Sequence, residues 1–346
     1  MLKLAALAVA LALVLLVPAA AGVEFAKHDL ESDESLRKLY ELWGARYKVA
    51  RDPGEKLRRF AIFKTKARRV YAFHLQVAGN TPLGLNIFAD LSDDEVRRDY
   101  KCRRTVVDGS NTMKRRGGDG TLPLPGDVDW REKSCNGQPC LSPVKQQEDC
   151  GACWAFAATA ALESHTAIRR SNQVRLSEQE LVDCDTKNNG CKGGLAVHAF
   201  DYVMKNGLAS SVDYPYRARN GTCQATTTSA VESGMQGFER VPAYDEFQLL
   251  QAVTYGPVVV AIAVGEKNEA FHDYYGGLYQ GACGTEIDHE MLLVGYGYDY
   301  YILRNSYGED WGDKGYLLLR RDLYGDNFKG TCGILMDGAV YPEIAT

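Results

Sequence analysis

The chain has 346 residues, enough for two or three folding units, and its 45% hydrophobic and 25% charged residues are the balance of an ordinary globular protein. That balance excludes a disordered chain and one largely embedded in a membrane. The net charge of -5 gives no basis for nucleic-acid binding, because the basic residues are outnumbered and scattered.

The N-terminal segment has the pattern of a secretory signal peptide over residues 1–21: a basic start, an apolar run over residues 4–17 and alanines at 19–21. The alternative is a membrane anchor, which needs about 20 apolar residues and no cleavage site. Export predicts the secretory pathway, with the lysosome or the extracellular space as destination, where disulfides persist. No later segment is apolar enough to span a bilayer, so we expect no stable membrane anchor.

Two amphipathic helices are predicted next, over residues 36–47 and 57–71, because apolar side chains recur there at helical spacing. Residues 84–90 predict a short extended stretch. A small helix follows, with Ser92 and Glu95 as its capping box.

A stretch rich in Gly, Asp, Ser and basic residues, about 108–121, has no periodicity and predicts a flexible processing linker. We place the domain boundary there, with residues 22–121 before it and residues 122–346 after it. The basic run Lys114-Arg115-Arg116 is either a processing site or only a solubilising one.

The region after the linker changes character along its length. Its first half carries helical signals at 153–170, after Ser177 and at 197–206. Its second half has short apolar runs between Gly-rich turns, which predict buried strands at 258–262, 291–294, 300–303 and 316–319. A helical lobe followed by a strand-rich lobe is an α+β protein with a cleft between the lobes.

The cysteine count is informative in an exported protein. Of the 10 cysteines, Cys102 lies before the boundary, and the nine that remain allow four bridges with one thiol left over. Zinc is a competing explanation for Cys150 and Cys153. Neither a second close cysteine pair nor a histidine pair accompanies them, which disfavours a metal site.

Several blocks carry a family resemblance. Cys150-Gly151-Ala152-Cys153-Trp154 fits the signature C-G-[SA]-C-[WY] of papain and cathepsins, which places a His and an Asn far downstream. The chain resembles a complete cathepsin L-like preproenzyme of the papain-like cysteine peptidases. Further matching blocks are residues 176–184 and 190–194, Asp288-His289, Asn305-Ser306-Tyr307-Gly308 and Trp311-Gly312.

The pro-region carries two motifs of the same family. Gly84, Asn86, Phe88 and Asp90 match the motif GxNxFxD in full. The longer helical motif E-R-F-N-I-N is kept in part. Glu55, Arg59 and Phe63 match it, whereas Lys66, Val70 and His74 stand at its last three positions.

The resemblance implies a two-lobed papain-like fold, a helical lobe plus a strand-rich barrel-like lobe, preceded by a helical inhibitory propeptide. It implies a cysteine endopeptidase made as a zymogen, which hydrolyses peptide bonds through a thiolate, an imidazolium and an acyl-enzyme. Cys153 would be the nucleophile, His289 the acid and base, Asn305 the group that orients the imidazole, and Gln147 the oxyanion donor. No cofactor or metal is implied. The alternative is a catalytically inactive papain-like binding or storage protein.

The resemblance also implies the bridges Cys150–Cys191, Cys184–Cys223 and Cys283–Cys332. Cys135 and Cys140 lie in an insertion that the papain pattern lacks, and we expect them to pair with each other. Cys153 is then the thiol left over, the residue that the motif marks as well. Pairing of Cys135 between two molecules is the alternative.

Three departures from the family pattern surround the expected site. Glu148 stands where the family has Gly, Tyr307 replaces the Trp that shields the His–Asn hydrogen bond, and Leu195-Ala196 replaces Tyr-Pro. By alignment the substrate-binding residues are Gly193, Gly194, Leu195, Ala196, Ala261, Ile287, Glu290, Trp311 and Asp337. Glu290 and Asp337 could pair a basic side chain two positions before the cut, or both could point to solvent.

The remaining expectations concern partners and modification. Asn220 heads a glycosylation sequon in a predicted loop. We expect a monomer that binds peptide or protein substrates, its own propeptide and cystatin-type inhibitors. Acid would release the propeptide if carboxylates such as Asp90 hold it in place.

Overall fold

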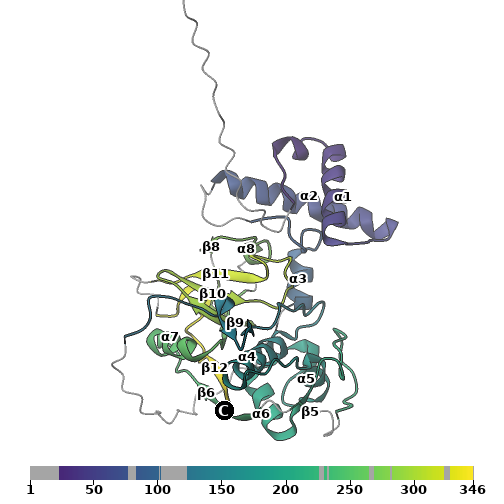
Figure 1. Cartoon of the computed structure of the whole chain (residues 1–346). Helices are drawn as coiled ribbons and strands as arrows, with labels where there is room; N and C mark the ends of the chain where they lie inside the picture. Colours follow the sequence, from purple (N-terminus) through teal and green to yellow (C-terminus); the bar gives the residue numbers. More distant parts are fainter. Residues whose placement is uncertain are drawn as a thin grey trace, which may run out of the picture.

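A computed structural model describes residues 23–76, 83–100, 102, 123–225, 230–231, 234–264, 269–280, 283–322 and 328–345. The expected signal peptide and processing linker lie outside these residues. The described chain forms a small helical unit above a larger mixed unit, and helix α3 runs down from the first to the second (Figure 1).

The N-terminal unit is helical and has its own apolar core. Trp43 and Phe63 are fully buried in it, and the Trp43 Nε1 donates to Asn86 O at 2.8 Å, which fastens the loop of the GxNxFxD motif to the helices. Its elements are η1 (Lys27–Leu30), α1 (Asp33–Tyr47), α2 (Pro53–Gln76) and α3 (Asp93–Tyr100).

Both predicted long helices exist, and α2 begins earlier than its apolar pattern does. Pro53 is the first residue of α2, a position where the missing N–H costs nothing because no helical carbonyl precedes it. The Asp52 carboxylate accepts from the backbone N–H groups of Gly54 and Glu55, both at 3.0 Å, and so caps the helix.

The capping box predicted for α3 is present, with Glu95 N donating to Ser92 Oγ at 3.2 Å and Ser92 N donating to Glu95 Oε2 at 2.8 Å. The stretch over residues 84–90 is extended only at its start, because its second half is a turn. The turn follows from Asn86, whose Oδ1 accepts from Phe88 N at 2.9 Å and folds the chain back.

The larger unit contains an eight-stranded sheet with the path β6-β12-β7-β9-β10-β11-β8, and β1 pairs with β9 beside this path. All four predicted strands belong to it. Its strands are β1 (Val128–Asp129), β6 (Met235–Arg240), β7 (Val258–Ile262), β8 (Leu278–Tyr279), β9 (His289–Tyr296), β10 (Tyr300–Arg304), β11 (Tyr316–Arg320) and β12 (Val340–Ile344). Two small two-stranded sheets complete the strands: β2 (Ser134–Cys135) with β3 (Gln138–Pro139), and β4 (Leu208–Ala209) with β5 (Ala230–Val231).

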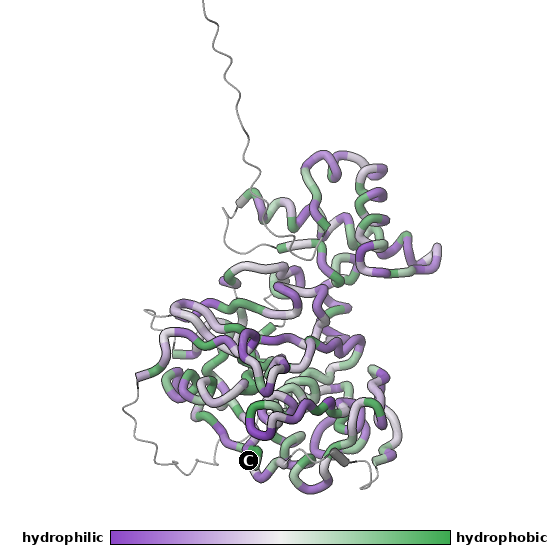
Figure 2. The backbone as a smooth tube through the Cα atoms, viewed as in Figure 1, coloured by the Kyte–Doolittle hydropathy of each residue, from purple (hydrophilic) through white to green (hydrophobic). Residues whose placement is uncertain are grey.

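The central strands read as continuous apolar runs because both faces of the sheet are covered. Along β9, Met291 and Leu293 belong to one core cluster, whereas Leu292 and Val294 belong to the other. Side chains alternate between the faces of a strand, so every second residue enters the opposite core. Figure 2 shows hydrophobic stretches along the chain in this region.

Helix α4 covers one face of the sheet and α7 belongs to the core on the other. The predicted helix at 153–170 is α4 with the same bounds, and Ser177 caps α5 by accepting from Glu180 N at 3.0 Å. The helices of this unit are η2 (Trp130–Glu132), α4 (Cys153–Arg170), α5 (Glu178–Cys184), η3 (Gly190–Lys192), α6 (Ala196–Asn206), α7 (Glu246–Tyr255), α8 (Glu269–His272) and η5 (Thr331–Gly333). The architecture is the expected α+β one, and α4 meets the sheet where β9 begins.

Candidate active site

Cys153 is the first residue of α4, an 18-residue helix, and is fully buried. The turn before it is held from the side, because Gly151 N donates to Cys191 O at 2.9 Å and the Trp154 Nε1 donates to Gly190 O at 3.1 Å. A long helix carries partial positive charge at its N-terminus, which favours an anion there. The sulfur of Cys153 therefore lies where a thiolate is stabilised.

His289 and Asn305 come from adjacent antiparallel strands. His289 is the first residue of β9, and Asn305 follows β10, which pairs with β9. The His289 Nε2 lies 2.8 Å from Asn305 Oδ1, and Glu290 N lies 3.2 Å from the Cys153 Sγ. The strand and helix ends thus bring together the three residues that the motifs marked.

The hydrogen bond fixes the tautomer of His289. Because the Asn305 Oδ1 can only accept, Nε2 carries the proton and the buried Nδ1 is left as the second ring nitrogen. Burial lowers the pKa of His289 to about 4, and the bond to Asn305 offsets this only in part. The imidazole is therefore neutral in this state of the protein.

Tyr307 covers the imidazole. Its ring centroid lies 5.1 Å from that of His289, and its side chain is 1% exposed. The replacement of Trp by Tyr at this position therefore leaves the His289–Asn305 bond shielded from water. Phe88 and Tyr100 pack edge-on against the Tyr307 ring, with ring centroids 5.3 and 5.5 Å from its centroid.

Gln147 is held in place by a residue that the sequence argument did not single out. The Ser306 Oγ donates to Gln147 Oε1 at 2.6 Å, which turns the amide nitrogen the other way. That nitrogen donates to Cys150 O at 2.8 Å and to Tyr100 O at 3.3 Å. Ser306 stands in the matched block after Asn305, and its proximity to Gln147 is a property of the fold alone.

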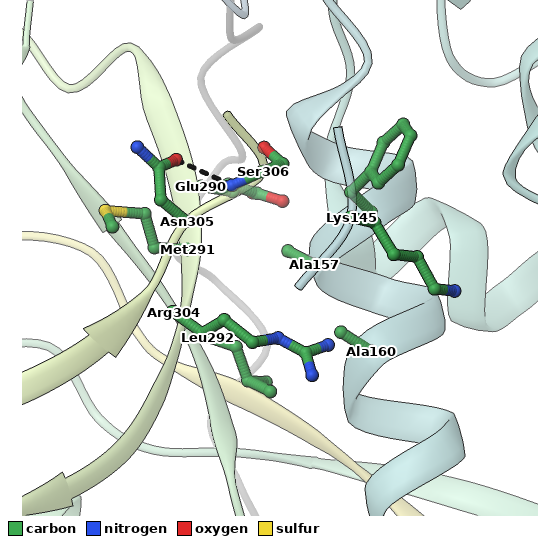
Figure 3. Close-up of a pocket in the computed structure, with 10 residues that line it drawn as sticks. Lys145, Ala157, Ala160, Glu290, Met291, Leu292, Arg304, Asn305 and Ser306 are labelled. Carbon is green, nitrogen blue, oxygen red and sulfur yellow. Dashed lines mark hydrogen bonds between the residues drawn. The ribbon is translucent and has the colours of Figure 1, made fainter. Parts of the chain in front are cut away.

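A small pocket lies between α4 and the strands β9 and β10, and Asn305 is among the residues that line it. Figure 3 shows Asn305 and Ser306 at one end, with the Ser306 N–H donating to Asn305 Oδ1 at 2.8 Å, and Arg304 reaching toward α4 beside Ala160. The side-chain oxygen Oδ1 of Asn305 thus accepts from both Ser306 N and the His289 Nε2. These two donors fix the rotamer of Asn305.

All 10 cysteines lie in the described residues, and all are paired. Cys150–Cys191, Cys184–Cys223, Cys283–Cys332 and Cys135–Cys140 are the expected pairs. The expectation that Cys153 is the thiol left over is wrong for this state, because Cys153 pairs with Cys102. The count of nine cysteines left out Cys102, because it lies before the domain boundary, in the expected propeptide. The zinc alternative fails too, since Cys150 and Cys153 both carry disulfides.

The N-terminal unit docks on the segment around α8. Asn86 Nδ2 donates to His272 O at 2.7 Å, and Gly84 N donates to Asp273 O at 2.8 Å. The Asp273 carboxylate, 2% exposed, accepts from Lys66 Nζ at 3.1 Å and pairs with Arg69. Lys66 stands where the family motif has Asn, so this departure supplies a buried ion pair between the two units.

Asp90 does not hold the N-terminal unit to the rest of the chain through its carboxylate. It pairs with Arg51 at 3.0 Å and accepts from Tyr40 at 3.0 Å, both within that unit. At the docking surface burial opposes ionisation of Asp93, but Arg69 and Lys66 outweigh it and lower its pKa to about 2. The stabilisation from Asp93 is complete above about pH 4 and is lost only as the pH falls through 2. Protonation of Asp93 therefore does not explain release at mildly acidic pH.

Some of the expected substrate-binding residues come together. Ala261 and Glu290 are register partners in β7 and β9, and the buried Glu290 accepts from Ala196 N at 2.9 Å through Oε2. A Cβ placed on Gly333 would lie 2.8 Å from Ile287 Cδ1. Ile287 therefore adjoins the turn after Gly333 that carries the half-buried Asp337.

The other expected residues lie around this group or apart from it. Gly193 has φ 111°, which favours Gly, and a Cβ on Gly194 would collide with Asn188. Leu195 is buried at the start of α6. Trp311 is also fully buried, and it packs on Tyr307, Phe271 and Tyr274 in an aromatic cluster.

Glu148 adopts φ 51°, the left-handed region in which Gly is favoured. The turn that the family builds with Gly is therefore kept here with backbone strain. Asn220 is exposed, its Oδ1 accepts from Cys191 N at 2.8 Å, and its amide nitrogen is the atom to which a glycan would be attached. Across the described ranges no group of three or more His, Cys, Asp or Glu could hold a metal ion.

Comparisons with known proteins agree with this geometry. Residues 124–342 match the family described as papain family cysteine protease, and residues 40–96 match the cathepsin propeptide inhibitor domain. Cysteine endopeptidase RepA of Oryza sativa subsp. japonica is 41% identical, over 93% of this chain and 89% of that protein. KDEL-tailed cysteine endopeptidase CEP2 of Arabidopsis thaliana is 37% identical, over 93% and 90%. The proform of the ragweed pollen allergen Amb a 11, a cysteine protease, has a TM-score of 0.79 at 33% identity, over 94% of this chain and 90% of that one.

Proposed function

Because the chain belongs to the papain family of cysteine proteases and is a cysteine endopeptidase zymogen with a propeptide inhibitor domain, we propose that Cys153 and His289 are its catalytic pair. One observation carries the assignment: the buried His289, bonded to Asn305 at 2.8 Å, begins the strand whose next amide lies 3.2 Å from the Cys153 Sγ. The relatives are endopeptidases, so an inactive binding protein is not favoured.

The first half of the reaction forms the acyl-enzyme. The Cys153 thiolate attacks the carbonyl carbon of the scissile bond, and a carbon–sulfur bond forms as the carbonyl oxygen takes the negative charge. Gln147 Nε2 and the Cys153 backbone N–H donate to this oxyanion, and losing one such donor costs about 3 to 4 kcal/mol. His289 then gives its proton to the leaving nitrogen, and the carbon–nitrogen bond breaks.

The second half releases the acyl group. The neutral His289 takes a proton from water, and the resulting hydroxide attacks the thioester carbon. The carbon–sulfur bond breaks, Cys153 leaves as the thiolate, and His289 keeps the proton. A thiolate close to the imidazole raises its pKa, so the low pKa of His289 belongs to the state in which Cys153 is bonded to Cys102.

The residue-level assignment is tested by kinetics of the reduced enzyme after propeptide removal. Cys153→Ser and His289→Ala are expected to abolish hydrolysis of a peptide substrate. Asn305→Ala is expected to retain a fraction, because it orients the imidazole without touching substrate. Asp310→Asn, an exposed change outside the site, is the control. Full turnover by Cys153→Ser would refute the assignment.

We also propose that the pocket beside Glu290 accepts Arg or Lys two positions before the cut, besides bulky apolar residues. The support is the gathering of Ala196, Ala261 and Glu290, with Asp337 on the neighbouring turn. A carboxylate in such a pocket attracts a basic side chain by a charge-assisted hydrogen bond. Dipeptide substrates with Arg, Phe or Leu at that position, compared before and after Asp337→Ala, test this. Unchanged Arg turnover would refute it.

The domain limits and the compartment are proposals as well. We propose a signal peptide at 1–21, a propeptide at 22–121 and a mature enzyme from 122, secreted or delivered to a lysosome and inhibited by cystatin-type proteins. Five disulfides favour an oxidising compartment, and one relative is called KDEL-tailed. Within the described residues no helix is long and apolar enough to cross a membrane. N-terminal sequencing of active enzyme fixes the mature start.

A further inference from the structure

The propeptide reaches the nucleophile with a sulfur of its own. Cys102 is paired with Cys153, with their Cα atoms 6.0 Å apart, and both residues are fully buried. That separation lies in the range of about 4.4 to 6.8 Å that disulfides require. The other four disulfides each join two cysteines after residue 122, so this bridge alone joins the propeptide to the enzyme.

Cys102 is held in place by the residues around it. Tyr100, two residues earlier, packs its ring 5.5 Å from Tyr307, and its carbonyl accepts from Gln147 Nε2 at 3.3 Å. Cys102 itself belongs to the core cluster of the helical lobe and its Sγ lies 3.4 Å from Gly151 O. The propeptide therefore presents this sulfur to Cys153 through contacts that involve the oxyanion donor as well.

We infer that Cys102 is a redox modification site that locks the precursor by a disulfide to the nucleophile. This rests on the proposed role of Cys153. A sulfur bonded to another sulfur cannot attack a carbonyl, so a locked precursor is inactive even when the linker has been cut. Every cut in residues 103–121 leaves Cys102 on the propeptide side, and the propeptide stays attached.

The lock forms by oxidation of two thiols and opens by thiol–disulfide exchange. The lock forms when the two thiols give two electrons and two protons to a disulfide oxidant, which becomes a dithiol. It opens when a thiolate reductant of the glutathione or dithiol class attacks the Cys102 sulfur. The Cys102–Cys153 bond breaks, Cys153 leaves as a thiolate, and a second thiol reduces the mixed disulfide on Cys102.

The direction of attack follows from the surroundings of the two sulfurs. A thiol of lower pKa is the better leaving group in thiol–disulfide exchange. The N-terminus of α4 and the imidazole of His289 stabilise the Cys153 thiolate, which makes Cys153 a good leaving group. Reduction thus returns the enzyme with its nucleophile ionised and ready for use.

The test uses the full-length precursor purified without reductant. It is cut in the linker with trypsin under native conditions, unfolded in the presence of iodoacetamide and run on a gel. We expect the propeptide to stay with the enzyme without reductant and to separate after dithiothreitol. Mass spectrometry is expected to find a Cys102–Cys153 peptide pair. In Cys102→Ser the propeptide should separate without reductant.

The same samples are then treated with a thiol-directed epoxide at acidic pH. The cut wild type is expected to label only after dithiothreitol, and cut Cys102→Ser to label without it. The mature enzymes are identical once the propeptide is gone, so their kcat must agree. Separation of the wild-type propeptide without reductant, or alkylation of both cysteines in the unreduced precursor, overturns the lock. Reduced enzyme that takes no label contradicts the role of Cys153 instead.

Discussion

The buried ion pair between Lys66 and Asp273 is expected to contribute much of the free energy with which the propeptide binds the enzyme. Asp273→Asn keeps the shape of the side chain and removes its charge from Lys66 and Arg69. Breaking a buried pair by removing one partner costs about 3 to 5 kcal/mol, since the other charge stays buried. At 1.4 kcal/mol per factor of ten, 3 kcal/mol weakens propeptide binding about 100-fold.

The assay uses Cys153→Ser precursor cut in the linker, in which neither hydrolysis nor the Cys102 disulfide interferes. Dissociation of the propeptide on dilution is followed by gel filtration at neutral pH. The control is Asp310→Asn, which breaks the exposed 3.6 Å pair between Arg46 and Asp310 across the same boundary. Exposed pairs contribute about 0 to 1 kcal/mol, so this control should lose at most about fivefold. Equal losses in the two variants would refute the reasoning.

Three further changes probe the site and the propeptide. Glu148→Gly relieves the left-handed backbone of an exposed residue and should raise the free energy of unfolding by about 1 kcal/mol, measured in urea; a decrease would contradict the turn argument. Ser306→Ala removes the hydrogen bond that orients Gln147 and should lower kcat about two- to tenfold at constant KM, whereas a change in KM alone would point to substrate binding. Burial beside Phe88 lowers the pKa of His272 to about 3. When the propeptide leaves, His272 becomes exposed and can bind a proton, so the affinity of the propeptide should fall as the pH drops from about 6.5 toward 3. In the same gel-filtration assay, His272→Gln should remove a fall in propeptide affinity of up to tenfold per pH unit. An unchanged slope of affinity against pH would exclude His272 as the group that binds the proton.

Local signals in the sequence located the elements that carry the site. Helix α4 has the predicted bounds because its alanine-rich run is a strong helix former throughout, and the four apolar runs became strands because each is short and lies between turns. The beginning of α2 was placed too late because the apolar pattern starts at Leu57, whereas the helix begins at Pro53, a residue that fits the first turn of a helix.

Contacts between distant segments could not be derived in this way. The bond from Ser306 to Gln147 joins residues 159 positions apart, and the pair of Lys66 and Asp273 joins residues 207 apart. The Cys102–Cys153 pair was missed for a related reason. To find an unpaired cysteine by counting, one must first decide which cysteines belong to one folded unit. The propeptide folds against the enzyme, so Cys102 belongs in the same count as Cys153.

The central claim is that His289 holds the sulfur of Cys153 as an anion once the propeptide has gone. The pH dependence of Cys153 alkylation by iodoacetamide in the reduced mature enzyme tests it directly, because only the thiolate reacts. We expect an apparent pKa well below the ordinary value of about 8.5, and a clear rise toward that value in His289→Ala. A pKa near 8.5 in both enzymes would contradict the account.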